Sequence, residues 1–465
     1  MLSHNHILMV VWAVIVGGCV VGPLVAKAET LVVPAITVSE RYDSNVFNSE
    51  VVPGVKPSDY VSSVAPQVRM LHKGALGEGT FQLIGIGEKY INNPDLDYFG
   101  GGGGFNFNLD RLVKQFMPQA SLLVTDNIFY TPQAPSYSVS DAPGETLNPL
   151  TRGIQIVRVR TLTNNASAVG RYALTPTVNF VATYVHSMIR YGGTFTSAIG
   201  FNLIDTNSQL ITAGPQFQVS RQDILGVSYI YQQTDFLGGQ TTGIANQFVT
   251  HGGTATWLRN WSPEVKSNVY GGASVLQQDS GLPSGGGGQG TSGTPVYYNG
   301  GASLTWTETS GGSSTVMGAV SPSPGLGGGG GGGFSGGGAA KTLAALNYSV
   351  GVFPSTYSAG VPLISHVLTA SVNRRIGSNV YGWGNGNYSR NDSLSSATSF
   401  ADISFQSYGG GGGVAYMFTP TLFASLNADY QRLKGNGLGV SGVSGGASAN
   451  FERYTTMLSL TTFWK

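Results

Sequence analysis

The sequence contains few residue clusters of the kind that enzymes use. The run Gly333-Phe334-Ser335-Gly336-Gly337 matches the nucleophile-elbow pattern, but that motif needs a strand-turn-helix context and here lies in a glycine-rich stretch. The six histidines show no pair at metal-ligand spacing; they are His4, His6, His72, His186, His251 and His366. We therefore expect no enzyme activity, no metal and no cofactor.

Two arginines share one face of an extended segment. Arg158 and Arg160 alternate with Val157 and Val159. If the valines meet lipid, both guanidinium groups enter a water-filled lumen, because an arginine at the lipid midplane costs roughly 2–4 kcal/mol. They would form either a charged constriction that selects an anionic solute or polymer, or ion pairs that brace the wall. Further candidates for the lumen or its rim are Arg171, Asp429, Glu88, Glu452 and Arg453.

The composition favours a membrane-embedded β-protein over a soluble one. Only 10% of the 465 residues are Asp, Glu, Lys or Arg, against roughly 25% in a typical soluble domain. Past Leu31, no run of about 20 apolar residues is available for a membrane-spanning helix. The net charge of +1 points to no nucleic acid or other strongly charged partner.

Amphipathic segments recur from Ile36 onward. In residues 211–219 and 225–234, apolar and polar side chains alternate, which is the two-residue period of a strand. The turn from Ser220 to Asp223 joins these segments into a hairpin. One face is apolar and the other hydrophilic, as in a barrel whose outer side meets lipid and whose inner side lines water.

The connections between these segments alternate in length. Short turns recur at 174–177, 261–264 and 418–421, each with a Ser/Thr-Pro step, whereas long connections span 131–153, 192–205, 278–294 and 433–450. Transmembrane barrels sort their connections in this way, with short turns in the periplasm and long loops outside. A soluble β-sandwich has no reason to do so.

We predict one all-β domain, a large antiparallel transmembrane β-barrel of 18 strands, with 16 as the alternative. Parity slips between Val159 and Tyr172, and the imino acid Pro215, indicate bulges. Residues 309–340 contain seven consecutive glycines and are expected to form a flexible Gly-rich insertion. The expected strands are 36–47, 60–72, 80–91, 97–108, 118–130, 156–173, 178–191, 207–219, 224–236, 245–260, 265–277, 295–307, 341–353, 363–374, 379–390, 404–417, 421–433 and 451–464.

Two other glycine runs, Gly100 to Gly104 and Gly409 to Gly413, lie inside expected strands. Glycine weakens a strand unless something fills the missing volume. One interpretation is tight curvature with aromatic rings from neighbouring strands over the gap. The other is a smooth, wide lumen wall along which a polymer slides.

The last twelve residues, YTTMLSLTTFWK, predict the strand that closes the barrel by pairing with 36–47. The segment resembles the terminal strand that the barrel-assembly machinery recognises in bacterial outer-membrane barrels, although the chain ends in Lys465 and not in the aromatic residue. The expected assembly signal consists of Tyr454, Leu458, Leu460, Phe463 and Trp464.

The N-terminus indicates export. An apolar core from Ile7 to Val25 precedes Ala26-Lys27-Ala28, so residues 1–28 are predicted to be a signal peptide and 29–465 the barrel domain. A signal anchor and a lipoprotein site at Cys19 are the alternatives. Cys19 is the only cysteine, so cleavage after Ala28 leaves no disulfide or cysteine-based metal site.

Several short motifs resemble the beta-barrel porin-2 family. Thr37 to Phe47 (TVSERYDSNVF), then Ser58-Asp59-Tyr60 and Val64-Ala65-Pro66, are similar to the opening of that family. Thr125 to Tyr130 (TDNIFY) repeats the first motif, and Gly351 to Ser355 (GVFPS) looks like a late element of the family. The glycine-rich insertion and Lys465 depart from the family pattern.

Members of that family are outer-membrane barrels often associated with exopolysaccharide systems. The resemblance implies a component of an exopolysaccharide export system, working with polysaccharide and with periplasmic export proteins. Two other functions use the same architecture: a general diffusion porin for small solutes, and a structural or adhesion barrel. The expected location is the bacterial cell outer membrane, where lipid and the barrel-assembly machinery are the expected partners.

Overall fold

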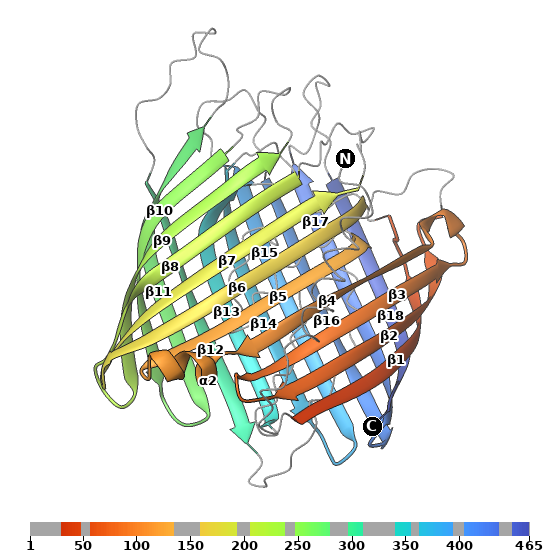
Figure 1. Cartoon of the computed structure of the whole chain (residues 1–465). Helices are drawn as coiled ribbons and strands as arrows, with labels where there is room; N and C mark the ends of the chain where they lie inside the picture. Colours follow the sequence, from red (N-terminus) through yellow and green to blue (C-terminus); the bar gives the residue numbers. More distant parts are fainter. Residues whose placement is uncertain are drawn as a thin grey trace, which may run out of the picture.

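The alternating segments form one closed sheet. In the computed structural model, eighteen antiparallel strands of the described chain pair in sequence order, and β1 pairs with both β2 and β18 (Figure 1). No strand in this sheet has a free edge. The predicted antiparallel barrel is confirmed, with 18 strands and not the alternative 16. The structure describes residues 29–47, 56–133, 159–192, 205–237, 247–279, 296–309, 340–354, 362–393, 404–436 and 449–464.

The strand bounds differ from the predicted ones by a few residues at most ends, and β1 begins earlier, at Glu29. The strands are β1 (Glu29–Asp43), β2 (Asp59–Lys73), β3 (Glu78–Tyr90), β4 (Tyr98–Asn108), β5 (Ala120–Gln133), β6 (Val159–Thr175), β7 (Val178–Tyr191), β8 (Asp205–Gln218), β9 (Asp223–Leu237), β10 (Gln247–Asn260), β11 (Val265–Asp279), β12 (Val296–Thr309), β13 (Ala340–Pro354), β14 (Pro362–Arg375), β15 (Val380–Ser393), β16 (Ser404–Thr419), β17 (Leu422–Asn436) and β18 (Ala449–Phe463).

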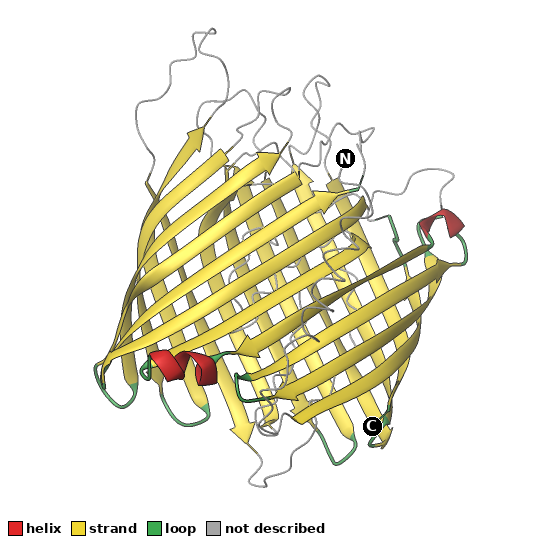
Figure 2. Ribbon diagram, in the orientation of Figure 1, coloured by secondary structure: helices red, strands yellow, loops and turns green. Residues whose placement is uncertain are grey.

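Two short helical elements, which the alternation did not predict, cover connections between strands (Figure 2). The α-helix α2 (Asp110–Phe116) joins β4 to β5, and the 3-10 helix η1 (Pro94–Leu96) joins β3 to β4. Asp110 holds α2 against the wall because its carboxylate accepts the backbone N–H of Leu122 at 3.0 Å. No helix among the described residues is long and apolar enough to cross a membrane.

The connections sort by length between the two ends of the barrel, as predicted. One end carries tight turns such as those between β6 and β7 and between β16 and β17; we call it the short-turn end, and it corresponds to the periplasmic side. The strands β12 and β13 stop at this end too, with Thr309 and Ala340 as register partners. The predicted Gly-rich insertion is therefore attached at the short-turn end, while residues 310–339 lie outside the described residues.

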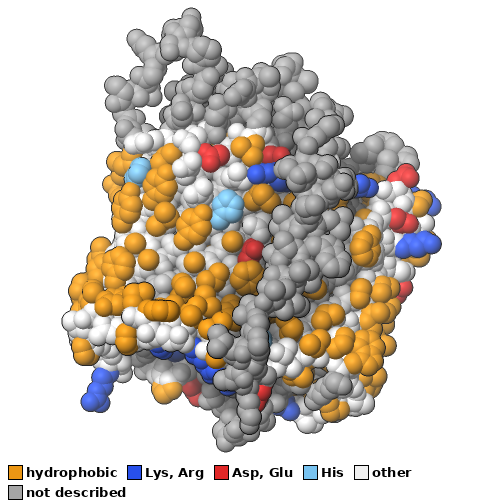
Figure 3. All heavy atoms as spheres, in the orientation of Figure 1, with side chains coloured by type: hydrophobic (Ala, Val, Ile, Leu, Met, Phe, Trp, Pro, Cys, Tyr) orange, Lys and Arg blue, Asp and Glu red, His pale blue; other side chains and the backbone are white. Residues whose placement is uncertain are grey.

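The outer wall is apolar around the barrel. Val38, Leu304, Leu346, Leu426 and Leu458 are all more than one third exposed, although each belongs to a regular strand. Hydrophobic side chains lie over much of the described wall in Figure 3, and many charged ones lie toward its two ends. In such a closed barrel the backbone groups of the strands bond to one another, and the outer wall presents apolar side chains to lipid. The predicted location in the bacterial outer membrane is confirmed.

Tyrosines lie on the outer surface toward the end of the barrel that is opposite the short turns. Tyr42 and Tyr60 lie 5.2 Å apart on β1 and β2, and Tyr430 and Tyr454 lie 4.9 Å apart on β17 and β18. Tyrosine prefers the boundary between hydrocarbon and water because its ring is apolar and its hydroxyl is polar.

Neighbouring side chains occupy the space beside the glycine runs in β4 and β16. A Cβ atom on Gly102 would collide with the ring of Phe129, and one on Gly413 would lie 2.5 Å from the ring of Trp383. A Cβ atom on Gly411 would collide with the carboxylate of Asp429. This arrangement agrees with the interpretation in which rings from adjacent strands occupy the gap, with polar side chains sharing that role.

The predicted bulge between Val159 and Tyr172 is wrong. The strand β6 keeps one register with β5 from Val159 to Tyr172, and its register against β7 shifts only between Ala173 and Thr175, beside the turn. At Pro215 the β8–β9 pairing is interrupted without a change of register, because proline has no N–H to donate.

Candidate solute pathway

The inner wall of the barrel is lined mainly by small, uncharged polar side chains. Hydroxyl groups on adjacent strands bond to one another across it: Ser39 to Ser63 at 2.6 Å, Ser425 to Ser459 at 2.6 Å and Thr37 to Thr461 at 2.9 Å. Each bridge consumes hydrogen-bonding capacity between neighbours and stiffens the wall. Such a surface can solvate a passing polar molecule without holding it through a strong charge.

A buried ionic network interrupts this neutral lining near the end opposite the short-turn end, which we call the long-loop end. Arg41 donates to both carboxylate oxygens of Glu88 at 3.2 Å, and the Tyr90 hydroxyl donates to Glu88 at 2.7 Å. Arg453 donates from Nε to the two oxygens of Asp43 at 3.0 and 3.2 Å. The carboxylates of Asp43 and Glu88 are each only 1% exposed.

The network spans the seam where the barrel closes. Arg41 lies 3.9 Å from Asp43 on the same strand, so the two ion pairs form one chain from β18 through β1 to β3. Buried charges of this kind are tolerated only when each has its partner, because desolvation otherwise costs several kcal/mol. The chain of charges is therefore a rigid part of the wall.

Asp59 performs a similar structural task beside the network. Its fully buried carboxylate accepts the backbone N–H groups of Ile91 and Asn92 at 3.0 and 2.8 Å and the side-chain amide of Asn93 at 2.8 Å. The Ser-Asp step at the start of β2 therefore has a structural role: the carboxylate of Asp59 fixes the path of the chain between β3 and β4.

At the long-loop end the outer face of the wall becomes polar, and the inner face carries an apolar cluster on β9 to β11 beside its polar residues. Phe236, Phe248 and Leu276 point inward and are buried together, with the two phenyl rings 5.6 Å apart. On the outer face at this end, Gln247 donates to Asp235 at 2.8 Å, and similar polar pairs recur around the rim. The strands therefore continue beyond the hydrocarbon layer, where the outer surface meets water and headgroups.

The polar outer rim corrects the prediction for Arg160. Because β6 keeps one register, Arg160 shares the outward face of Leu162 and Tyr172. The reasoning from lipid cost fails here because the segment lies in the polar outer rim and not in the apolar band. Arg158 lies outside the described residues.

The other predicted residues are placed as follows. Arg171 and Asp429 both face inward, on β6 and β17, and do not lie on neighbouring strands. Glu88 and Arg453 belong to the ionic network, while Glu452 faces outward and pairs with Arg432 at 3.0 Å. The predicted constriction is therefore not assembled from these residues as a group.

The predicted assembly signal lies on β18. Tyr454, Leu458, Leu460 and Trp464 face outward and are about half exposed, whereas the ring of Phe463 faces inward and lies 5.4 Å from that of Phe423. The pairing of this strand with β1 was expected and is observed from Ala35–Phe463 to Asp43–Thr455. The role of these residues in assembly stays a prediction.

Sequence reasoning missed the inward cations near the short-turn end. Arg69 pairs in register with Val33 and Gln82, and Lys266 pairs with Asn260, so both share the face of the neutral lining. Together with Arg171 they place positive charge around the inner mouth. Parity within each strand could have found them, since Arg69 follows Ala65 and Gln67 at two-residue steps.

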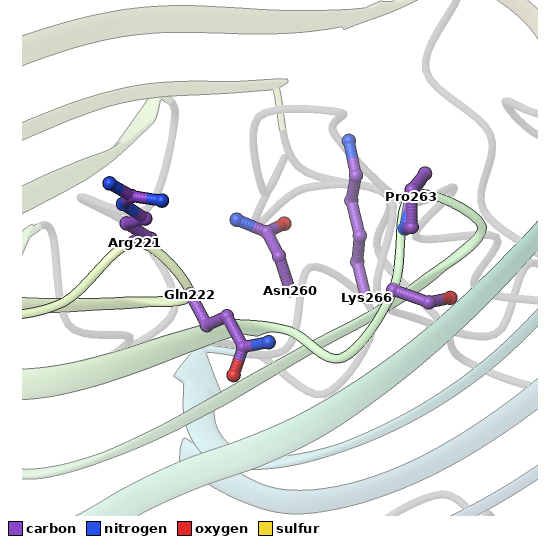
Figure 4. Close-up of a pocket in the computed structure, with 6 residues that line it drawn as sticks. Arg221, Gln222, Asn260, Pro263 and Lys266 are labelled. Carbon is purple, nitrogen blue, oxygen red and sulfur yellow. The ribbon is translucent and has the colours of Figure 1, made fainter.

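A surface cavity of about 380 Å³ lies among the turns at this mouth. It is formed between the β8–β9 and β10–β11 connections (Figure 4). The residues that line it are Arg221, Gln222, Asn260, Ser262, Pro263 and Lys266. No group of three or more His, Cys, Asp or Glu side chains that could hold a metal occurs in the described part of the chain.

Several solved structures have a similar arrangement of strands. The outer membrane protein OpdK from Pseudomonas aeruginosa has 10% identity and a TM-score of 0.39, covering 93% of this chain and 99% of its own. OpdF from the same organism, in complex with glucuronate, has 8% identity and a TM-score of 0.39, with coverage of 94% and 99%. A BenF-like porin from Pseudomonas fluorescens has 7% identity and a TM-score of 0.38, with coverage of 95% and 100%.

The chain has the fold of a closed, 18-stranded antiparallel β-barrel. No protein-family model and no curated protein matches its sequence. The resemblance to the beta-barrel porin-2 family, and the export function that it implies, therefore stay predictions that rest on the short motifs.

Proposed function

We propose that this chain is an outer-membrane channel through which small polar solutes diffuse. The observation that carries the proposal is the inner wall: hydroxyl and amide side chains line the sheet, in a barrel whose outer wall is apolar. A surface of this kind lowers the cost of moving a hydrated molecule across the hydrocarbon layer without a binding step that would trap it. No bond is made or broken.

Conductance of the purified, refolded protein in a planar bilayer tests this function. We expect discrete, stable current steps in potassium chloride, together with swelling of proteoliposomes in isotonic solutions of small sugars. A folded barrel, identified by its heat-modifiable gel mobility, that produces neither current nor swelling would contradict the proposal.

Polysaccharide export is the function that the family resemblance implies, and it gains no support from the glycine runs. Because Phe129, Trp383 and Asp429 occupy the space beside Gly102, Gly413 and Gly411, the wall there is not bare. Normal polymer secretion by a strain that lacks the gene, with reduced uptake of small solutes, is the result expected of a solute channel. The adhesion alternative depends on loops that lie outside the described residues.

We also propose the barrel-assembly machinery as a partner. The pairing of the first and last strands in one closed sheet supports this proposal, because such a sheet has to be closed as the chain enters the membrane. Depletion of that machinery should leave the chain in the periplasm in a form that lacks heat-modifiable mobility.

A further inference from the structure

The cavity at the short-turn end offers hydrogen-bond donors and two positive charges. Arg221 lies in the β8–β9 turn, Asn260 is the last residue of β10, and Lys266 is the second residue of β11. Figure 4 shows these three side chains extending to the same side of the turns, while Gln222 points the opposite way. No carboxylate lines the cavity.

The same turns carry two carboxylates: Glu264 is not among the lining residues, and Asp223 is already occupied. It accepts hydrogen bonds from the indole N–H of Trp257 at 2.9 Å and the Ser220 hydroxyl at 2.8 Å, and it lies 3.4 Å from Arg259. These contacts place it with the outward-facing residues of β10. Neither Arg221 nor Lys266 forms an ion pair within the described part of the chain, in contrast to Arg259.

The turns that carry the three donors are held in place. The Ser220 hydroxyl accepts the backbone N–H groups of Gln222 and Asp223 at 3.0 and 2.9 Å, and the Ser262 hydroxyl accepts that of Val265 at 3.0 Å. The backbone N–H of Asn260 donates to Gln222 at 2.8 Å and ties one turn to the other. A ligand would meet donors that are already positioned, which reduces the entropy lost on binding.

We propose that Arg221, Asn260 and Lys266 form a binding site for the oxyanion group, a carboxylate or a phosphate, of a small organic solute. The planar guanidinium of Arg221 matches two oxygens of such a group, Lys266 adds a point charge, and the Asn260 amide donates a further hydrogen bond. The cavity is open to solvent, with a volume of about 380 Å³, so it leaves room for the oxyanion group while the rest of the solute extends into water. The site rests on the proposed function, since it lies at the inner mouth of the proposed channel.

Ligand-detected NMR on the full-length barrel in detergent tests the site without requiring conduction. The probes are benzoate, phenyl phosphate and neutral benzamide, which share a ring and differ in the group presented. We expect benzoate or phenyl phosphate to bind and benzamide not to bind. The stronger of the two anions identifies the oxyanion that the site prefers.

The variant that removes both charges is Arg221→Gln combined with Lys266→Gln, and its matched control is Arg374→Gln on the outward face at the same end. We expect the dissociation constant for the preferred anion to rise at least about tenfold in the double variant, because two charge-assisted hydrogen bonds are lost. The control should bind as the wild type does. Heat-modifiable mobility verifies that each variant is folded.

Failure of both anions to bind the wild type, equal binding of benzamide, or unchanged binding by the folded double variant would overturn the proposed site. The conductance measurement separates this result from the proposed function. A conducting barrel that binds no anion refutes the site alone, whereas anion binding by a barrel that conducts no current supports the site and refutes the channel.

Discussion

Arg453 in the last strand donates from one nitrogen to both carboxylate oxygens of Asp43 in the first strand, across 410 residues of chain. The side chains are 8% and 1% exposed, so the pair is shielded from water at the place where the barrel closes. Backbone hydrogen bonds join the two strands, and this buried ion pair adds a side-chain contact between them.

Asp43→Ala should weaken the seam. The substitution leaves Arg453 buried without its partner, and the loss of one member of a buried pair costs about 3 kcal/mol or more. Denaturant unfolding in detergent, followed by tryptophan fluorescence, measures the change. The matched control is Asp392→Ala, which removes the partner of half-exposed Arg390 and should have a much smaller effect. Equal stability of the two variants would contradict the role assigned to the seam.

Gly214→Ala should impair assembly. Its methyl group collides with the backbone carbonyl oxygen of Val227, which cannot move aside because β7 and β9 flank the strand. The yield of heat-modifiable barrel should fall. Gly271→Ala is the control, because nothing lies within 4 Å of the added methyl group. Loss of assembly in both variants would mean that the collision is not the cause.

Arg69→Gln combined with Arg171→Gln should reduce the preference of the channel for anions. Both side chains face the lumen near the short-turn end, and a charge at a pore mouth attracts counter-ions. The reversal potential in a salt gradient should move toward cation selectivity, most strongly at low ionic strength. Arg390→Gln, on the outer face, should leave it unchanged. An unaltered potential in the double variant would show that these charges do not act on the ion path.

Removal of residues 463–465 should cripple assembly, whereas removal of Lys465 should preserve or improve it. The longer truncation deletes the Phe463 ring that packs on Phe423. It also deletes the backbone N–H of Trp464, which donates to the backbone carbonyl of Pro34 at 3.0 Å across the seam. The fraction of heat-modifiable protein in isolated outer membranes measures the outcome. If both truncations assemble as the full chain does, the C-terminal residues are not the assembly signal.

Most of the fold could be predicted because the wall imposes a two-residue period on every strand. Segments such as 211–219 and 225–234 alternate cleanly, and short and long connections separate the two ends of the barrel. The helix α2 was missed because it is only 7 residues long and follows no apolar period of its own. Its carboxylate contact from Asp110 to Leu122 depends on the neighbouring strand, which alternation does not reveal.

The candidate site was harder to predict because alternation gives the face on which a residue lies but not its position along the barrel axis, in the apolar band or in the polar rim. Arg160 was assigned to the lumen on the assumption that its neighbours meet lipid, but its strand already stands in the polar rim. Arg41 and Asp43 occupy inward positions in the motif that suggested the family, yet their charges were not used. Their partners Glu88 and Arg453 lie on other strands, so the network exists only through the register of the closed sheet.

The Gly-rich insertion has a consequence for engineering. Its flanking residues, Thr309 and Ala340, are register partners at the short-turn end, where turns of a few residues join most of the other hairpins. The barrel needs only a tight turn between them, so the length of this segment is decoupled from the geometry of the wall. The position is therefore suited to insertions. An affinity tag or a small folded module spliced there would be displayed in the periplasm from an unaltered barrel.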